Sequence, residues 1–117
     1  MINCKRVYDA ISDEDGYRVL IDRLWPRGIK KVDLQHDEWN KDVAPSNELR
    51  KWFHQHTDQF TQFVEKYQAE LNQTTAWKNL IEKARQGNLT LLYSAKNIEH
   101  NQAVVLKAFI EEKMKNK

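Results

Sequence analysis

Cysteine is nearly absent from this chain, because Cys4 is the only one among 117 residues. A single cysteine cannot form an internal disulfide, which favours a reducing compartment and excludes a cysteine-rich metal site. Long apolar runs are also missing, so no segment approaches the roughly 18 residues needed to span a bilayer. The first ten residues, MINCKRVYDA, lack the apolar stretch of a secretory signal. We therefore expect a cytoplasmic protein without a membrane segment, in which Cys4 packs as a small apolar residue of the first strand.

An excess of basic charge is lacking as well. The 19 Lys and Arg residues face 17 Asp and Glu residues, and the formal net charge is only +2. Proteins that bind nucleic acid usually carry a larger basic excess, so we do not expect nucleic acid as the main partner. Any attraction for anions must come from a local cluster. The contents of 40% hydrophobic and 31% charged residues are typical of one folded domain, here residues 1–117.

Glycine and proline number only three and two, and no repeat or linker interrupts the chain. Apolar patterns predict strands over residues 2–8, 17–24 and 89–93. The run Val19-Leu20-Ile21 in the second of these is typical of a strand that is covered on both faces. It ends near Pro26, since proline cannot donate to a sheet ladder.

The central part of the chain has the spacing of amphipathic helices. We expect a helix over residues 47–53, with Ser46 as N-cap. A second helix is expected after Thr57, its predicted N-cap, with an apolar stripe formed by Phe60, Phe63, Val64, Tyr67 and Leu71. A third helix is predicted over residues 76–86, ending at Gly87, and a fourth follows Asn101 with Val104, Val105, Ala108, Phe109 and Met114 on its apolar face. Residues 30–42 fit neither period and remain unassigned.

Strands separated by helices predict an α/β fold: a small, mainly parallel sheet of three or more strands packed with about four helices in a single compact domain. In open parallel sheets, ligands bind beyond the carboxyl ends of the strands. This rule selects three loops, at residues 9–12, 22–28 and 94–101.

The loop after the second strand holds the densest group of candidate residues. Arg23 and Arg27 flank Trp25, and arginine forks grip phosphate or carboxylate in a bidentate way, so all three are candidate ligand-binding residues. Asp22, at the start of the loop, is a candidate catalytic carboxylate. A structural interpretation stays open, in which Asp22 and Arg23 form an ion pair and Trp25 covers the edge of the sheet.

The loop before the last helix holds the second group. Ser94, Lys96 and Asn101 are candidate ligand-binding residues, because N–H groups at a helix N-terminus attract anions. His100 is a candidate catalytic residue, since imidazole transfers protons near neutral pH. The alternative is that Asn97, Glu99 or Asn101 only caps the helix.

A third and weaker group lies around Pro45. Its members are Trp39, Lys41, Asp42, Ser46 and Arg50, of which Arg50 is a candidate ligand-binding residue. His54 and His56 lack a third ligand at metal-site spacing, so no metal is expected. The chain has no glycine-rich phosphate loop and no nucleophile elbow, and the residues imply no particular cofactor.

Three long segments together resemble a known family. They are YRVLIDRLWPRG (17–28), EWNKDVAPSNELRKWF (38–53) and LTLLYSAKNIEHNQAVVL (89–106), and they are similar to the YeaO-like proteins, a branch of domain-of-unknown-function family 488. The resemblance implies a compact bacterial α/β protein without an assigned substrate. It also marks a set of motif positions: Asp22, Arg23, Trp25, Pro26, Arg27, Lys41, Asp42, Pro45, Ser46, Arg50, Ser94, Lys96, His100 and Asn101.

Longer members of that broad family resemble this chain after the second strand but carry a cysteine motif after the last strand. This chain has Ser94 and Lys96 there, and Cys4 has no arginine six positions on, so any catalysis would have to be acid-base or electrostatic. The leading hypothesis is a pocket for a small anion such as phosphate, a nucleotide or a phosphometabolite. The alternatives are a nucleic-acid- or protein-binding regulatory module, and an accessory protein whose polar motifs serve folding only. The chain is expected to be a monomer or a homodimer.

Overall fold

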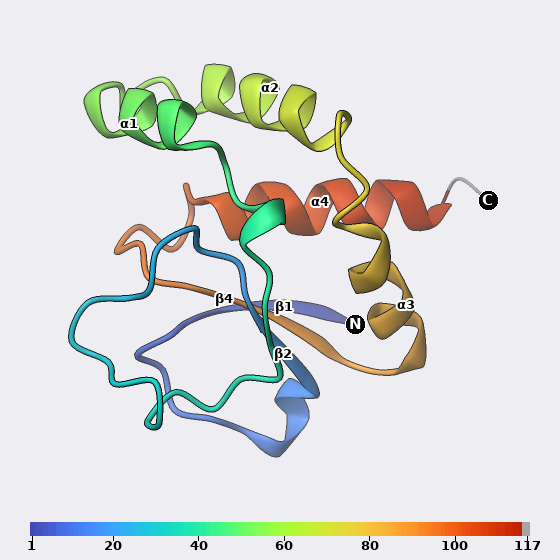
Figure 1. Ribbon diagram of the computed structural model, residues 1–117. Helices are drawn as coiled ribbons and strands as arrows, with labels where there is room; N and C mark the ends of the chain where they lie inside the picture. Colours follow the sequence, from blue (N-terminus) through green and yellow to red (C-terminus); the bar gives the residue numbers. More distant parts are fainter. Residues whose placement is uncertain (116–117) are drawn as a thin grey trace.

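The computed structural model of this protein describes residues 1–115. Its centre is a four-stranded sheet in which all neighbouring strands are parallel, in the order β1-β4-β2-β3 (Figure 1). The strands are β1 (Ile2–Arg6), β2 (Tyr17–Leu20), β3 (Glu38–Trp39) and β4 (Leu89–Tyr93). The prediction of an α/β fold with a parallel sheet is confirmed, and β4 has the predicted bounds.

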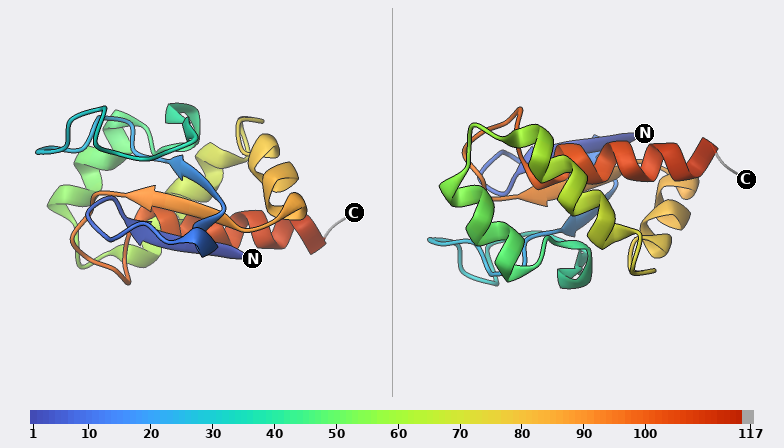
Figure 2. Two further views of the ribbon diagram at one scale, coloured as in Figure 1. Left: turned by 90° about the horizontal axis from the view of Figure 1, so that it is seen from below. Right: turned by 90° about the horizontal axis from the view of Figure 1, so that it is seen from above.

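Four helices lie on one side of this sheet. They are α1 (Asn47–Gln55), α2 (Phe60–Leu71), α3 (Lys78–Gln86) and α4 (Gln102–Lys115), and two short 3-10 helices are η1 (Asp13–Asp15) and η2 (Lys41–Val43). Helix α4 packs against β1 and β4, α2 packs against α4, and α1 packs against α2 (Figure 2). Within residues 1–115, no helix has the length and apolar character required to cross a bilayer.

Strand β4 is buried along its whole length, because both faces of the sheet are covered. Leu89, Leu91 and Tyr93 point into the large core under the helices. Leu92, between them, points into a smaller core on the opposite face, which it shares with Leu20 of β2. The expectation that the second predicted strand, now β2, is covered on both faces is confirmed, because Val19 lies in the large core and Leu20 in the small one.

The long loop between β2 and β3 covers the second face of the sheet. Leu34 of this loop is buried in the small core, and Trp25, Ile29 and Trp39 pack around it. The indole Nε1 of Trp25 donates a hydrogen bond to the carbonyl of Ile29 at 2.6 Å, which closes the loop on itself. The loop has no helix of its own, so tertiary packing holds it in place.

The helix boundaries follow local capping chemistry in part. Ser46 caps α1 as predicted, since its hydroxyl accepts a hydrogen bond from the N–H of Leu49 at 3.1 Å. The prediction of Thr57 as the cap of α2 is wrong, because a turn intervenes and Gln59 occupies that position without a side-chain bond. Helix α3 begins at Lys78, two residues later than predicted. It ends before Gly87, whose backbone is extended rather than left-handed.

Several strand and helix predictions need correction in detail. Strand β2 ends at Leu20 rather than at residue 24, because the chain leaves the ladder once Ile21 has donated its N–H to Leu92. The unassigned residues 30–42 contain β3, a strand too short to show a period. On α4, Ala108 is exposed, contrary to prediction; the buried residues are Ala103, Val105, Leu106, Phe109 and Ile110.

Candidate functional site at the carboxyl ends of the strands

Asp22 lies where β2 leaves the sheet, and its carboxylate is buried among donors. Its Oδ2 accepts hydrogen bonds from the backbone N–H of Ser94 at 3.0 Å and from the Ser94 hydroxyl at 2.6 Å. Its Oδ1 accepts from Nε2 of Gln102, the first residue of α4, at 2.5 Å. Only 7% of Asp22 is exposed. The carboxylate therefore ties together the ends of β2 and β4 and the start of α4.

Burial raises the pKa of Asp22, and the hydrogen bonds from Ser94 and Gln102 oppose this rise without cancelling it. Both carboxylate oxygens of Asp22 accept donors from the protein. We conclude that Asp22 braces the loops in this structure. This geometry does not support the hypothesis that Asp22 acts as a catalytic acid or base.

Arg23 points toward the segment that precedes α1. Its Nε donates to the carbonyl of Pro45 at 3.0 Å and its Nη2 to the carbonyl of Ala44 at 3.3 Å. No ion pair joins Asp22 to Arg23 within residues 1–115, so the alternative that they pair is wrong. The guanidinium of Arg23 instead attaches the end of β2 to the start of α1.

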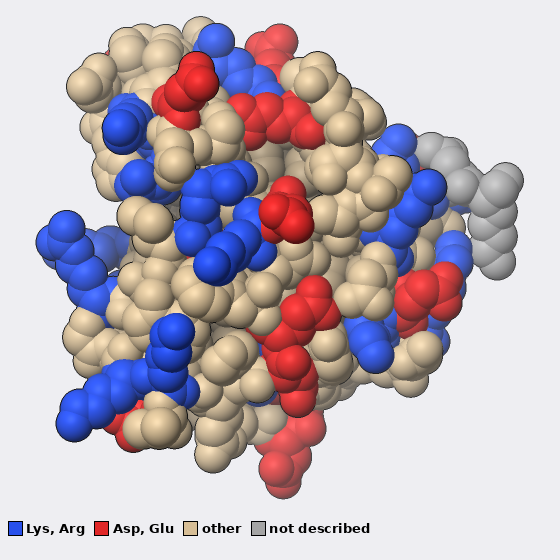
Figure 3. Space-filling model, in the orientation of Figure 1, with Lys and Arg blue, Asp and Glu red and all other residues tan. Residues whose placement is uncertain are grey.

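Arg50, the fourth residue of α1, lies close along the chain to the carbonyls that Arg23 holds. Its Nε is buried and has no hydrogen-bond acceptor within residues 1–115. Figure 3 shows Lys and Arg side chains gathering in the region between α1 and the loops that follow the strands. Ser46 plays a structural part here, because its N–H and hydroxyl donate to the carboxylate of Glu70 at 2.9 and 2.5 Å.

The loop after β4 is ordered by asparagines. The Oδ1 of Asn101 accepts from the N–H of Val104 at 3.0 Å, and its Nδ2 donates to the carbonyl of Asn97 at 2.8 Å. Asn101 is 1% exposed. The alternative interpretation, in which Asn101 caps the last helix, is therefore confirmed.

His100 and Lys96 lie on the exposed side of this loop. The imidazole of His100 stacks on the ring of Phe60, with 4.4 Å between centroids and 18° between planes. No hydrogen bond between His100 and Asp22 is present within residues 1–115, so the two predicted catalytic residues do not form an acid-base pair in this structure. The stack instead fastens the loop to the start of α2.

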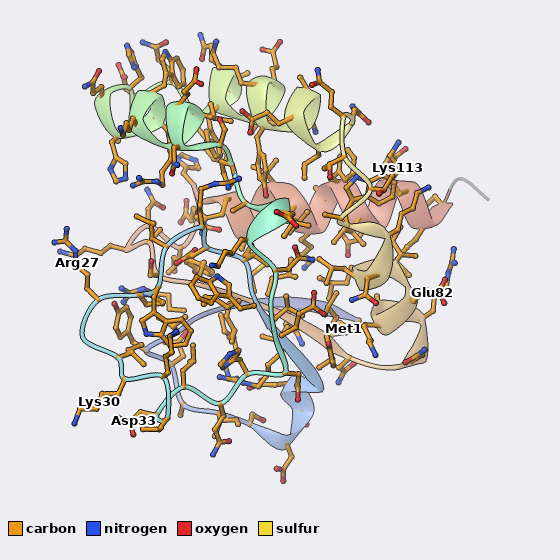
Figure 4. The ribbon with its side chains drawn as sticks, in the orientation of Figure 1. Met1, Arg27, Lys30, Asp33, Glu82 and Lys113 are labelled. Atoms are coloured by element: carbon orange, nitrogen blue, oxygen red, sulfur yellow. The ribbon has the colours of Figure 1, made fainter. Side chains whose placement is uncertain are left out.

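Arg27 and Trp25 differ in burial, since Arg27 is exposed and Trp25 is half-buried. Arg27 is exposed, and Figure 4 shows its side chain projecting away from the body of the molecule. Trp25 packs edge-on against Trp39, with ring centroids 5.2 Å apart, and belongs to the small core. This agrees with the structural interpretation of Trp25 as a residue that covers the sheet.

Two surface hollows lie elsewhere. One of about 650 Å³ runs beside β1 and is lined by Asn3, Cys4, Lys5, Ser12, Glu14, Asp15, Val104 and Lys107. The other, of about 430 Å³, lies at β3 and η2, where Trp39, Lys41 and Asp42 of the third predicted group contribute to its wall. Neither is lined by the arginines or by the loop after β4. The predicted arginines and the loop after β4 thus lie outside the linings of these two hollows.

Sequence reasoning missed two residues of this region. Arg6, at the end of β1, donates from Nε to the carbonyl of Ala95 at 2.9 Å and from Nη2 to that of Ser94 at 3.2 Å. Gln102 completes the donors around Asp22. The same rule that selected the loops could have found Arg6, because it is the last residue of a parallel strand.

Comparison with known proteins places the chain in a family. A family model described as "Inactive DUF488-N3 subclade" matches residues 1–117. This chain belongs to that DUF488 family. It is 56% identical over 106 residues to the uncharacterized protein YeaO of Escherichia coli, which covers 90% of this chain and 92% of the relative. It is 39% identical over 105 residues to the uncharacterized protein Rv3073c of Mycobacterium tuberculosis, covering 90% and 89%.

The resemblance to YeaO-like proteins is therefore confirmed, and with it a family whose named relatives are uncharacterized. No solved structure matches this chain.

Proposed function

We propose that this protein is a non-catalytic anion-binding domain, which holds the phosphate group of a small molecule between Arg23 and Arg50. The observation that carries this proposal is the buried Nε of Arg50, which has no acceptor within residues 1–115. A buried donor without a partner costs about 1–3 kcal/mol, and more when the group is charged. An anion that accepts from this N–H would remove that cost.

Arg23 supplies the second half of the proposed site. Its hydrogen bonds to the carbonyls of Pro45 and Ala44 hold the guanidinium in one orientation beside the start of α1. Two oriented guanidinium groups match the several oxygens of a phosphate better than two flexible ammonium groups do. Glu70 already occupies the N–H of Ser46 before α1, so the ligand relies on the arginines rather than on the helix N-terminus.

The engagement of the candidate catalytic residues favours binding without turnover. Asp22 has no unoccupied carboxylate oxygen, and His100 is stacked on Phe60. The loop after β4 contains no cysteine that could act as a nucleophile. The word "inactive" in the description of the family model agrees with this interpretation.

Inorganic phosphate and a nucleoside triphosphate are suitable first probes. We expect either one to raise the melting temperature of the parent protein and to bind measurably in isothermal titration. Arg50→Ala should weaken binding at least tenfold, and Arg50→Lys should not restore it because an ammonium lacks the planar fork. Arg85→Ala, at an exposed arginine of α3 that lies 3.7 Å from Glu82, is the matched control. Equal binding by the parent and by Arg50→Ala, or no binding by either, would contradict the proposal.

A second candidate function is protein binding by the loop surface. Five of the large exposed hydrophobic residues lie in loops that follow strands: Tyr8, Ile11, Leu24, Val32 and Ile98. Exposed apolar side chains at one end of a sheet favour a protein partner over nucleic acid. A Leu24→Ser, Ile98→Ser variant should lose a partner that the parent captures from a cell extract. Recovery of the same proteins by both would contradict this candidate.

A further inference from the structure

Strand β1 forms the margin of the sheet, and its outer edge has no neighbouring strand within residues 1–115 (Figure 2). The N–H of Val7 donates to the carbonyl of Tyr93, and the carbonyl of Met1 accepts from the N–H of Leu89. Because the direction of these groups alternates along a strand, the backbone groups of the odd-numbered residues of β1 face β4. Those of Ile2, Cys4 and Arg6 therefore face outward.

The outward groups are not all equally open. The N–H of Arg6 donates to the carboxylate of Asp9 at 2.9 Å, and the carbonyl of Arg6 accepts from the N–H of Asp9 at 3.0 Å, so Asp9 closes one end of the edge. Ile2 and Cys4 lie in the part that remains, and the hollow of about 650 Å³ runs along it beside Asn3, Cys4 and Lys5. An open strand edge is a template for pairing with another strand.

We propose that a second copy of this chain occupies this edge, with the two β1 strands antiparallel and Cys4 opposite the partner's Cys4. In this register each Cys4 N–H donates to the partner's Cys4 carbonyl. The pairing does not use Arg6, because Asp9 already bonds both its N–H and its carbonyl. The two four-stranded sheets then form one continuous sheet across a twofold axis.

The charges beside the edge are self-complementary. Lys107 of α4 lines the hollow together with Cys4. Glu111 lies four residues further along α4, one turn from Lys107 on the same side of the helix. Positions four apart on a helix are separated by about 6 Å, so a twofold axis that passes between them brings each charge opposite its unlike partner.

Helix α4 runs in the direction opposite to β1 (Figure 1). Two copies of α4 related by the proposed axis are therefore antiparallel, and each Lys107 faces the partner's Glu111. An unrelated extended peptide would have no such matched pair to offer. This self-complementarity is why we infer a second copy rather than a foreign strand.

Sedimentation equilibrium of the full chain tests the proposal independently of anion binding. We expect a reversible increase toward twice the 14.0 kDa mass of one chain as concentration rises. Glu111→Lys should raise the dissociation constant at least tenfold, because four positive charges then meet at the axis. The double variant Lys107→Glu, Glu111→Lys should restore the parent value, since it exchanges the two charges and keeps them matched.

Glu82→Lys, at an exposed residue of α3 that does not line the hollow beside β1, is the control and should dimerise like the parent. Hydrogen exchange then reports the register, because the Cys4 amide should be protected at least tenfold more in concentrated than in dilute solution. A monomer at every concentration up to about millimolar would overturn the proposal. So would a dimer that the exchanged pair fails to restore, or one in which protection of Cys4 does not change.

Discussion

The carboxylate of Asp22 and the hydroxyl of Ser94 lie 2.6 Å apart, although 72 positions separate them in the sequence. Each follows a buried parallel strand, and β2 and β4 are neighbours in the sheet. Their contact therefore connects the two loops that hold most of the predicted site residues. It makes Asp22 a structural residue whose loss should be visible in stability.

Asp22→Ala should lower the free energy of unfolding by about 2–4 kcal/mol, because the N–H and hydroxyl of Ser94 and the amide of Gln102 lose their shared acceptor. Urea unfolding followed by circular dichroism measures this change. Asp33→Ala removes a carboxylate that is exposed, and it should change stability by less than about 0.5 kcal/mol. Equal stability of the two variants would show that Asp22 does not brace the loops.

Asp15 should make the protein sensitive to acid. Burial raises the pKa of Asp15, but hydrogen bonds from the backbone of Ser12 and from the side chains of Lys5 and Arg18 outweigh it and hold the pKa below its ordinary value. A depressed folded-state pKa contributes stability above the ordinary pKa near 4, and this contribution is lost as pH falls toward the folded-state pKa.

Urea midpoints measured between about pH 6 and pH 3 should therefore fall more steeply for the parent than for Asp15→Asn, which cannot titrate. The variant should also be less stable at pH 6, since it loses its ion pairs with Lys5 and Arg18. Parallel pH profiles for the two proteins would contradict this prediction.

Gly16 should not tolerate a side chain. Its φ is +65°, and a Cβ there would lie 2.2 Å from the carbonyl oxygen of Asn88, which accepts the N–H of Tyr17 at the start of β2. Gly16→Ala should cost about 3 kcal/mol or more, as strain and a backbone clash add. Gly28 has a similar φ of +78° with nothing within 4 Å of its Cβ position, so Gly28→Ala isolates the strain alone.

Thermal unfolding compares the two alanine variants directly. We expect Gly28→Ala to lower the free energy of unfolding by about 1 kcal/mol, well below the loss caused by Gly16→Ala. If both substitutions lower it by the same amount, the close approach of Asn88 to Gly16 does not add to the loss.

Tyr67 anchors α2 to the chain that precedes α1. Its hydroxyl donates to the carbonyl of Val43, and the side chain is fully buried. Tyr67→Phe leaves that carbonyl without its donor and should cost about 1–2 kcal/mol in chemical unfolding. Tyr8→Phe removes a similar bond, 2.9 Å to the carbonyl of Arg27, from a residue that is 49% exposed, where water replaces the donor and the loss should be small.

Periodicity predicted the elements that carry a strong apolar pattern. Strand β4 has the predicted extent, and the apolar stripe predicted from Phe60 to Leu71 lies in helix α2, because runs such as Leu89 to Tyr93 and the spacing of Phe63, Tyr67 and Leu71 depend on local burial alone. Strand β3 was not predicted, since two residues cannot show a period and their pairing with β2 depends on the loop that brings them there.

The rule for parallel sheets selected the loops after β1, β2 and β4 as the candidate site, and in the structure Asp22 and Ser94 from two of these loops are in contact. Which groups would find partners inside the protein could not be predicted, because hydrogen bonds such as those from Ser94 and Gln102 join residues far apart in sequence. The stacking of His100 on Phe60 is a contact of the same kind.

By itself, the amino-acid sequence determined the class of fold, the family and the end of the sheet where polar residues gather, because these follow from residue types and their spacing. Only the tertiary structure decided that Asp22 braces loops, that Arg23 holds the carbonyls before α1 and that the Nε of Arg50 lacks an acceptor. The physical reason is that a charged side chain acquires its role from the donors and acceptors that surround it after folding, and those come from distant segments of the chain.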